Sequence, residues 1–303
     1  MSKTTVLWVM LMMIVTPAAS RAQSDRWQVG TAPSFSSGKY GTDTRTEVLH
    51  TPITARRLFD AGDVTLVFPF TCIRGNGAVR VVNGTPVRTE RIGNIGPTSG
   101  TTTRQGGTDT TSRTGGTSGT TRGTGDVTPG SGTGALAPEI SSCGMGDIVV
   151  RGRYYLLDER AWMPTIAVRA HVKTPTASAD KGLGTGRPDE GVGFEVSRTI
   201  AAGFMAMVDG GYTLIGKPTG VEFNDNWWYD VGLGQDLGKG LVNLSVLFEE
   251  YRAIVPGLAN ARAVLAAVSV KGASGWRVQV SGEFGLSDGA PDHGVTFGAS
   301  RRF

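Results

Sequence analysis

The sequence predicts an all-β transmembrane antiparallel β-barrel of about 12 strands, with one long disordered loop. An apolar leader, alternating hydropathy along most of the remaining chain, and connections that alternate between short and long support this prediction. The 303-residue chain has 18% charged residues and a mean hydropathy of −0.09. These values exclude a polytopic helical membrane protein, which needs repeated apolar runs of about 20 residues. They are compatible with a membrane barrel, whose strands alternate apolar and polar side chains.

Residues 1–22 are predicted to be a secretory signal peptide. A lysine lies near the N-terminus, Val6 to Val15 form an uninterrupted apolar run, and small residues precede a cleavage site at Gln23. The alternative is a single membrane anchor, which is disfavoured because the apolar run is too short to span a bilayer as a helix. The mature chain is therefore expected to be exported.

Alternating hydropathy is clearest between Trp276 and Phe284, where apolar and polar residues take turns. Strict alternation predicts a strand whose two faces meet different environments. Several of the segments with this pattern have the roughly 10 residues that a tilted strand needs to cross a bilayer. Within residues 23–303 there are twelve candidate strands: 26–36, 45–58, 63–74, 147–157, 163–173, 190–199, 203–214, 227–237, 240–251, 261–271, 276–286 and 294–303.

The connections between these segments alternate in length. Short turns, such as 60–63 and 238–239, are followed by longer connections, of which 75–146 is the longest. This pattern is typical of an outer-membrane barrel with short periplasmic turns and long extracellular loops. Aromatic residues gather at the strand ends and are expected to form the two interfacial girdles. They are Trp27, Phe35, Trp162, Phe204, Tyr212, Trp227, Tyr229 and Trp276.

The long extracellular loop 75–146 contains a low-complexity tract, residues 96–134. Thr, Gly and Ser dominate the tract, so it can bury little apolar surface and is expected to be disordered. Loosely repeated units of nine residues lie within it. They have two interpretations, a ligand-binding repeat or replication slippage in an unconstrained loop, and we favour the second.

Cys72 and Cys143 flank the long loop, near the outer ends of two strands that should be neighbours. Because an exported protein meets an oxidising periplasm, a disulfide is favoured over two free thiols. At the other end of the chain, the last strand finishes on Phe303, which shares a face with Val295 and Phe297. This ending resembles the sorting signal of Gram-negative outer-membrane proteins. Outer-membrane lipid and the outer-membrane assembly machinery are therefore expected partners.

Four different short motifs lie along the mature chain, at Ser36–Gly41, Leu66–Phe70, Gly144–Asp147 and Val172–Thr176, and the last is followed by Gly182–Gly186 and Asp189. These motifs resemble the family called the putative MetA-pathway of phenol degradation, a group of outer-membrane barrel proteins. The resemblance covers most of the mature chain except the low-complexity tract, which looks like an insertion. It implies transport linked to the degradation of aromatic compounds.

The sequence contains no constellation of residues that indicates catalysis or metal binding. The histidines, His50, His171 and His293, lack metal-ligand spacing, and no Cys-x-x-Cys motif occurs. A hydrolase barrel would need Ser and His on its outer wall, whereas His171 shares the face expected to line the lumen. We therefore expect no enzyme activity, no cofactor and no metal. No basic stripe interleaved with aromatic residues indicates nucleic-acid binding.

Charged side chains recur on the faces expected to line the lumen, and these are the candidate channel-lining residues. The basic ones belong to the fourth and fifth strands and the acidic ones to later strands. They are Arg151, Arg153, Arg169, His171, Lys173, Glu195, Asp209, Asp230, Glu249 and Glu283. A basic wall that faces an acidic wall would set up a field across a pore. The alternative, mutual neutralisation inside a plugged barrel, stays open at this point.

The functional hypothesis is an outer-membrane channel for the passive uptake of small molecules, aromatic ones included. A small-molecule substrate and a location in the bacterial cell outer membrane, reached through the periplasm, follow from it. One alternative is a non-conducting barrel that serves in surface display or adhesion through its Thr/Gly loop. A less favoured alternative is an outer-membrane hydrolase.

Cleavage of the leader can be tested directly. Because the apolar run ends in small residues before Gln23, mass spectrometry of isolated outer membranes should find Gln23 as the N-terminus. An intact Met1 on the membrane-inserted protein would contradict the prediction.

Overall fold

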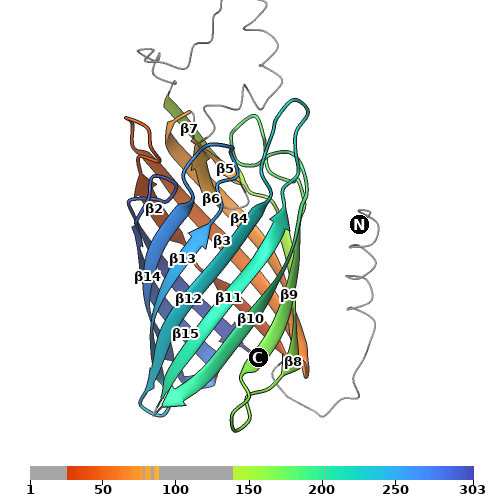
Figure 1. Cartoon of the computed structure of the whole chain (residues 1–303), viewed down its shortest axis with the longest axis vertical. Helices are drawn as coiled ribbons and strands as arrows, with labels where there is room; N and C mark the ends of the chain where they lie inside the picture. Colours follow the sequence, from red (N-terminus) through yellow and green to blue (C-terminus); the bar gives the residue numbers. More distant parts are fainter. Residues whose placement is uncertain (1–25, 78, 83–84, 89–138, 202) are drawn as a thin grey trace, which may run out of the picture.

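The computed structural model of the chain describes residues 26–77, 79–82, 85–88, 139–201 and 203–303. The predicted signal peptide 1–22 and the low-complexity tract 96–134 lie outside the described residues, so the expectations about them stay predictions. Within the described residues, the chain forms a closed antiparallel barrel (Figure 1). A β-barrel is therefore confirmed as the fold class.

The barrel sheet contains fourteen strand segments, and each pairs antiparallel with its neighbours. They are β1 (Trp27–Thr31), β2 (Ser34–Gly38), β3 (Thr46–Phe59), β4 (Gly62–Asn76), β7 (Glu139–Met145), β8 (Val149–Leu157), β9 (Thr165–Lys173), β10 (Asp189–Ala201), β11 (Phe204–Leu214), β12 (Asn226–Leu237), β13 (Val242–Tyr251), β14 (Ala261–Lys271), β15 (Trp276–Gly285) and β16 (His293–Arg302). A short hairpin, β5 (Val79–Val82) and β6 (Thr85–Arg88), forms a separate sheet, and a 3-10 turn, η3 (Ala273–Gly275), precedes β15.

In two places around the barrel, two strand segments together occupy the position of a single strand. β1 and β2 both pair with β3 and β16, and the register is the same on both sides of the break at Pro33. β7 and β8 both pair with β4, and residues 146–148 between them make a bulge opposite residues 68–69. The fourteen segments therefore occupy twelve positions, as the sequence predicts.

The barrel closes where the two ends of the sheet meet. β1 pairs with β16, and Trp27 and Phe303 exchange both backbone hydrogen bonds, at 2.9 and 2.8 Å. Closure pairs both sides of the strands around the barrel, which matters because an unpaired backbone group costs several kcal/mol in hydrocarbon. Among the described strands of this sheet, only β7, at the long-loop end, pairs on a single side, with β4. Within the described chain, no helix has the length and hydropathy needed to cross a membrane.

Alternation along the strands sorts the side chains into an apolar outer wall and a polar lumen. On β15, Val278 and Phe284 are exposed on the outside, whereas Ser281 on the opposite face is buried. At the end of the barrel with the short turns, the guanidinium of Arg57 lies 5.0 Å from the ring centre of Trp27 on the outer wall. Such pairing of an arginine with an interfacial aromatic residue suits the boundary between lipid and water.

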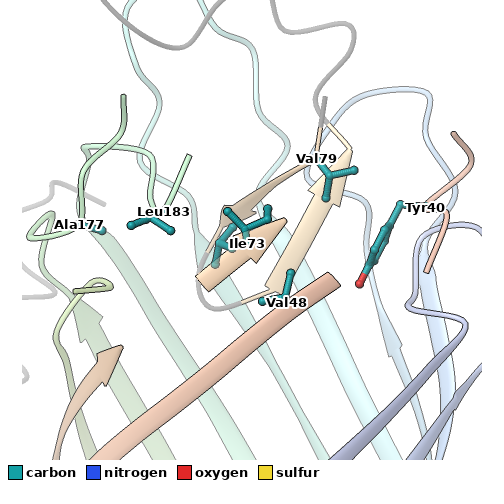
Figure 2. Packing of buried hydrophobic residues seen from close by; sticks show 7 residues of the cluster. Tyr40, Val48, Ile73, Val79, Ala177 and Leu183 are labelled. Carbon is teal, nitrogen blue, oxygen red and sulfur yellow. The ribbon is translucent and has the colours of Figure 1, made fainter. Parts of the chain in front are cut away.

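The β5–β6 hairpin packs into the mouth of the barrel at the long-loop end (Figure 1). On one side, Val79 and Val81 of β5 are buried in an apolar cluster with Tyr40, Val48, Ile73, Ala177 and Leu183, several of which Figure 2 shows converging from different loops and strands. On the other side, Val87 of β6 packs against a second cluster, formed by Ile215, Val221, Phe223, Ile254 and Val255. The hairpin was not predicted from the sequence. It joins loops that are distant along the chain into a packed cover.

Cys72 and Cys143 form a disulfide between β4 and β7, as the sequence predicts. The two residues are direct cross-strand partners, with an S–S distance of 2.04 Å. The bond ties together the two strands that lead into and out of the long connection holding the hairpin. In the chain-entropy model, closing a loop of this length stabilises the fold by roughly 4 kcal/mol.

A buried ion network fixes the connection between β9 and β10. The ammonium of Lys173 is fully buried and lies 3.0 Å from Asp147 and 2.8 Å from Asp189. Asp147 also accepts a hydrogen bond from the backbone N–H of Ala177, and Asp189 accepts one from that of Gly216. Two carboxylates therefore share one cation and hold two extracellular loops to the barrel rim. These residues belong to the motifs at Gly144–Asp147 and Val172–Thr176, with Asp189.

Replacing Lys173 should destabilise the barrel, because it leaves two buried carboxylates without their cation. We expect Lys173→Met to lower the unfolding free energy by about 3–5 kcal/mol. Lys217 offers a matched control, since it is half exposed and lies 3.7 Å from Asp225. Lys217→Met should cost less than about 1 kcal/mol. Urea unfolding in lipid vesicles, followed by tryptophan fluorescence, measures both. Equal losses in the two variants would contradict a special role for the buried network.

The disulfide predicts the labelling behaviour of the native protein. Alkylation without reducing agent should leave Cys72 and Cys143 unmodified, whereas alkylation after reduction should label both. Mass spectrometry of the labelled peptides reads the result. Full labelling of the folded, unreduced barrel would show that the bond does not form in the outer membrane.

Candidate functional site in the lumen

The lumen contains a cavity of about 560 Å³ below the hairpin. Its walls are polar side chains of the strands, and its roof is apolar, with Val87 of β6, Ile215, Ile254 and Val255. A smaller cavity of about 210 Å³ lies beside it, with Tyr251 and Pro86 lining both. The larger volume falls within the range of about 300–1,000 Å³ found for small-molecule sites.

A chain of ion pairs runs along one wall of the larger cavity, across strands β3 to β10. Asp63 pairs with Arg56 at 2.5 Å and with Arg153 at 3.7 Å. Glu195 pairs with Arg153 at 3.3 Å and with Arg169 at 3.0 Å. Three guanidinium groups thus share two carboxylates. Within this chain of ion pairs, the guanidinium groups exceed the carboxylates by one.

Arg151 adds a second positive charge to the same wall. It lies directly across the β8–β9 pair from His171, and Arg153 lies across from Arg169. Arg151 forms no salt bridge with any residue in the described ranges. The charges of Arg151 and Arg169 both act on His171. The Nη2 atom of Arg169 and the Nε2 atom of His171 are buried and have no hydrogen-bond partner among the residues that the structure describes.

Aromatic side chains form a flat surface next to these cations. The ring of Trp228 on β12 stacks on Tyr251 of β13, with centroids 6.3 Å apart, and the Arg169 guanidinium lies 4.8 Å from the Trp228 ring centre. Glycines on the neighbouring strands make room for the indole. A Cβ atom at Gly211 would lie 2.6 Å from the Trp228 ring, and one at Gly193 would lie 3.1 Å from it. The glycines therefore let the ring lie flat against the wall.

A row of carboxylates continues around the barrel. Glu195, Asp209, Asp230 and Glu249 are successive cross-strand partners on β10 to β13. Asp209, Asp230 and Glu249 form no salt bridge within the described part of the chain. Like charges placed directly opposite destabilise a sheet. The row is therefore a cost to the fold that other contacts must offset.

The structure places most of the sequence-derived candidates around the two cavities. Arg151, Arg153, Arg169, His171 and Asp230 line the larger cavity, and Glu249 and Glu283 line the smaller one. Glu195 and Asp209 join them through the ion pairs and the cross-strand row described above. Lys173 is placed differently, in the buried network at the rim, so its role there is structural.

Sequence reasoning missed several residues of the site. Trp228 lines the cavity, although the expected girdles included only its neighbours Trp227 and Tyr229. Arg56 and Asp63 also line it, from β3 and the start of β4. Ile53 and Phe68 are exposed on the outer wall, and Arg56 and Asp63 occupy the opposite face of the same strands. This alternation could have identified both residues as lumen-facing. Among the described residues, no group of His, Cys, Asp and Glu side chains is arranged to hold a metal ion.

The chain is similar in fold to solved outer-membrane channels. An outer membrane channel of the COG4313 group from Pseudomonas putida F1 aligns with a TM-score of 0.60 at 11% identity, covering 95% of this chain and 100% of that one. The NanC porin aligns with a TM-score of 0.48 at 6% identity, covering 91% and 100%. The CymD monoaromatic hydrocarbon channel aligns with a TM-score of 0.45 at 10% identity, covering 93% and 89%. The last two similarities are too weak to establish a shared fold.

No curated protein matches the chain by sequence. A family model does match it: the model described as "Putative MetA-pathway of phenol degradation" covers residues 56–303. The match includes all the strands from the end of β3 to β16, and so nearly the whole barrel. Together with the fold, it identifies the chain as a barrel of the bacterial outer membrane. The chain belongs to the family named for the MetA pathway of phenol degradation.

Proposed function

We propose that the protein is a passive channel through which small molecules, aromatic ones among them, cross the outer membrane. The observation that carries the proposal is the lumen cavity, whose charged wall is only partly neutralised by its own ion pairs. Complete neutralisation would favour a plugged structural barrel. Arg151 and the row of carboxylates from Asp209 to Glu249, which form no salt bridges among the described residues, instead favour a lumen that meets charged or polar solutes.

The proposed channel-lining residues are those around the cavities: Arg151, Arg153, Arg169, His171, Glu195, Asp209, Asp230, Glu249 and Glu283. The hairpin and its apolar clusters cover the extracellular mouth, so a solute has to pass beside them. We therefore expect a small conductance. We further propose that residues 1–22 direct export, that Phe303 is read by the assembly machinery, and that the protein carries out no catalysis.

Charge selectivity tests the channel. Changing Arg151, Arg153 and Arg169 together to Gln removes the basic wall and leaves the carboxylates, so selectivity should shift toward cations. The measurement is the reversal potential in planar bilayers across a salt gradient, with heat-modifiable migration as the check on folding. A shift of a few-fold in the permeability ratio is expected, because the acidic row already limits anion preference in the unmodified barrel.

Two outward-facing arginines provide the matched control for that experiment. Arg57 and Arg301 lie against Trp27 and Trp276 on the outer wall. Their replacement by Gln should leave the reversal potential unchanged. A folded triple variant that conducts with an unaltered reversal potential would show that the basic wall does not line the conducting path. A barrel that never conducts, and loses cell-surface binding when residues 96–134 are deleted, would favour surface display.

A further inference from the structure

We propose that the larger lumen cavity contains a binding site for small planar monocarboxylates, of which benzoate is the simplest probe. Arg151, Arg169 and His171 would hold the carboxylate, and the flat surface of Trp228 and Tyr251 would contact the planar body. The inference deepens the proposed channel function, because it names the class of solute. Binding can nevertheless be measured without conduction, so the two proposals can fail separately.

The charge of the wall selects an anion. The ion-pair chain already holds one guanidinium more than it has carboxylates, and Arg151 adds another cation that forms no salt bridge within the described ranges. An uncompensated charge behind low-dielectric walls is costly unless a counter-charge approaches it. An anion that enters the cavity supplies this counter-charge.

The free hydrogen-bonding groups select an acceptor such as a carboxylate. Arg169 Nη2 can only donate, and it is buried with no acceptor in the described part of the chain. His171 Nε2 is also buried without a partner and donates in one tautomer or when protonated. Arg151 lies directly opposite His171, and Arg169 lies two residues away on the same face of β9. Three donors therefore converge on one region of the wall, and a carboxylate with two oxygens can accept from all of them.

The flat surface beside the donors selects a planar body. Trp228, Tyr251 and the guanidinium plane of Arg169 lie together, and guanidinium and aromatic planes favour stacked partners. The His171 ring is also laid against the wall, because Gly191 leaves space under it: a Cβ atom there would lie 2.2 Å from the ring. The apolar roof of Ile215, Val255 and Val87 covers the part of a ligand that carries no charge.

A second negative charge would be repelled from the cavity. Asp230 lines it and has a buried carboxylate oxygen, Oδ1, without a hydrogen-bond partner. Its cross-strand neighbours Asp209 and Glu249 are also acidic. A monocarboxylate brings one negative charge, which the cations can compensate, whereas a dicarboxylate of similar size brings a second charge toward this row. The site should therefore prefer benzoate to phthalate.

Isothermal titration of the full-length mature barrel in detergent tests the proposal with four probes. Benzoate should bind. Benzyl alcohol, which lacks the charge, and phthalate, which carries two, should bind more weakly, as should cyclohexanecarboxylate, which is not planar. Binding of benzoate should weaken as the salt concentration rises, because the interaction is largely one of charges.

Variants assign the binding to the proposed residues. Arg151→Gln should weaken benzoate binding by about tenfold or more, because it removes a charged donor. Trp228→Leu should reduce the preference for benzoate over cyclohexanecarboxylate while leaving an anion site. Arg277→Gln is the matched control. Its side chain shares the lumen-facing parity of Gln279, opposite to exposed Val278, and lies at the other end of β15 from Glu283. It should leave benzoate binding unchanged.

Each result bears on one proposal or the other. Equal binding of benzoate and cyclohexanecarboxylate would overturn the planar site, and equal loss in the Arg151 and Arg277 variants would overturn the assignment to the basic wall. A folded barrel that conducts but does not bind benzoate removes this inference and keeps the channel. A barrel that binds benzoate but stays silent in bilayers keeps the site and removes passive conduction.

Discussion

The rest of the structure depends on the need to pair every backbone N–H and C=O group inside the membrane. Hydrocarbon offers no alternative partner, so the sheet has to close on itself. The reciprocal hydrogen bonds between Trp27 and Phe303, and the pairing of β1 with β16, complete this closure. Once the sheet is closed, alternation along each strand leaves two environments, lipid and lumen. The charged side chains of the strands then gather in the lumen, which is why the candidate site lies there.

The alternation along the strands explains why charged side chains lie in the lumen. It does not explain how they are arranged there. Pairing Arg56, Arg153 and Arg169 with Asp63 and Glu195 reduces the cost of placing charges between low-dielectric walls. The same reasoning would favour a carboxylate beside Arg151 and a cation beside Asp230, and the fold provides neither as a salt bridge in the residues described. The carboxylates instead stand opposite one another on neighbouring strands, where they repel. This arrangement costs stability, and the proposed function gives it a reason, because the charges would then act on solutes.

The alternating pattern was sufficient to predict the strands, the barrel, and the neighbouring positions of Cys72 and Cys143, because a period of two residues determines which side chains share a face. The pattern could not predict how deeply a side chain is buried or how far along the barrel axis it lies. Lys173 has the parity of Arg169 and His171, yet it lies fully buried at the rim, where Asp147 and Asp189 approach it from other segments. The β5–β6 hairpin was missed because its strands have only four residues each. Its stability comes from contacts with loops distant in sequence, such as the backbone hydrogen bond that Val81 donates to Gly182 at 2.9 Å.

The apolar mouth and the charged cavity impose successive and different demands on a solute. Beside the hairpin, a solute in the proposed channel would meet Val87, Ile254 and Val255, where small inorganic ions would lose hydration without gaining a partner. In the cavity below, an entirely apolar solute gains the roof and the Trp228 surface but leaves the donors of Arg169 and His171 unpaired. A solute with one flat apolar face and a single negative charge satisfies both regions in turn. In the proposed channel, the order of the two regions along the barrel axis would therefore favour amphiphilic solutes over either extreme.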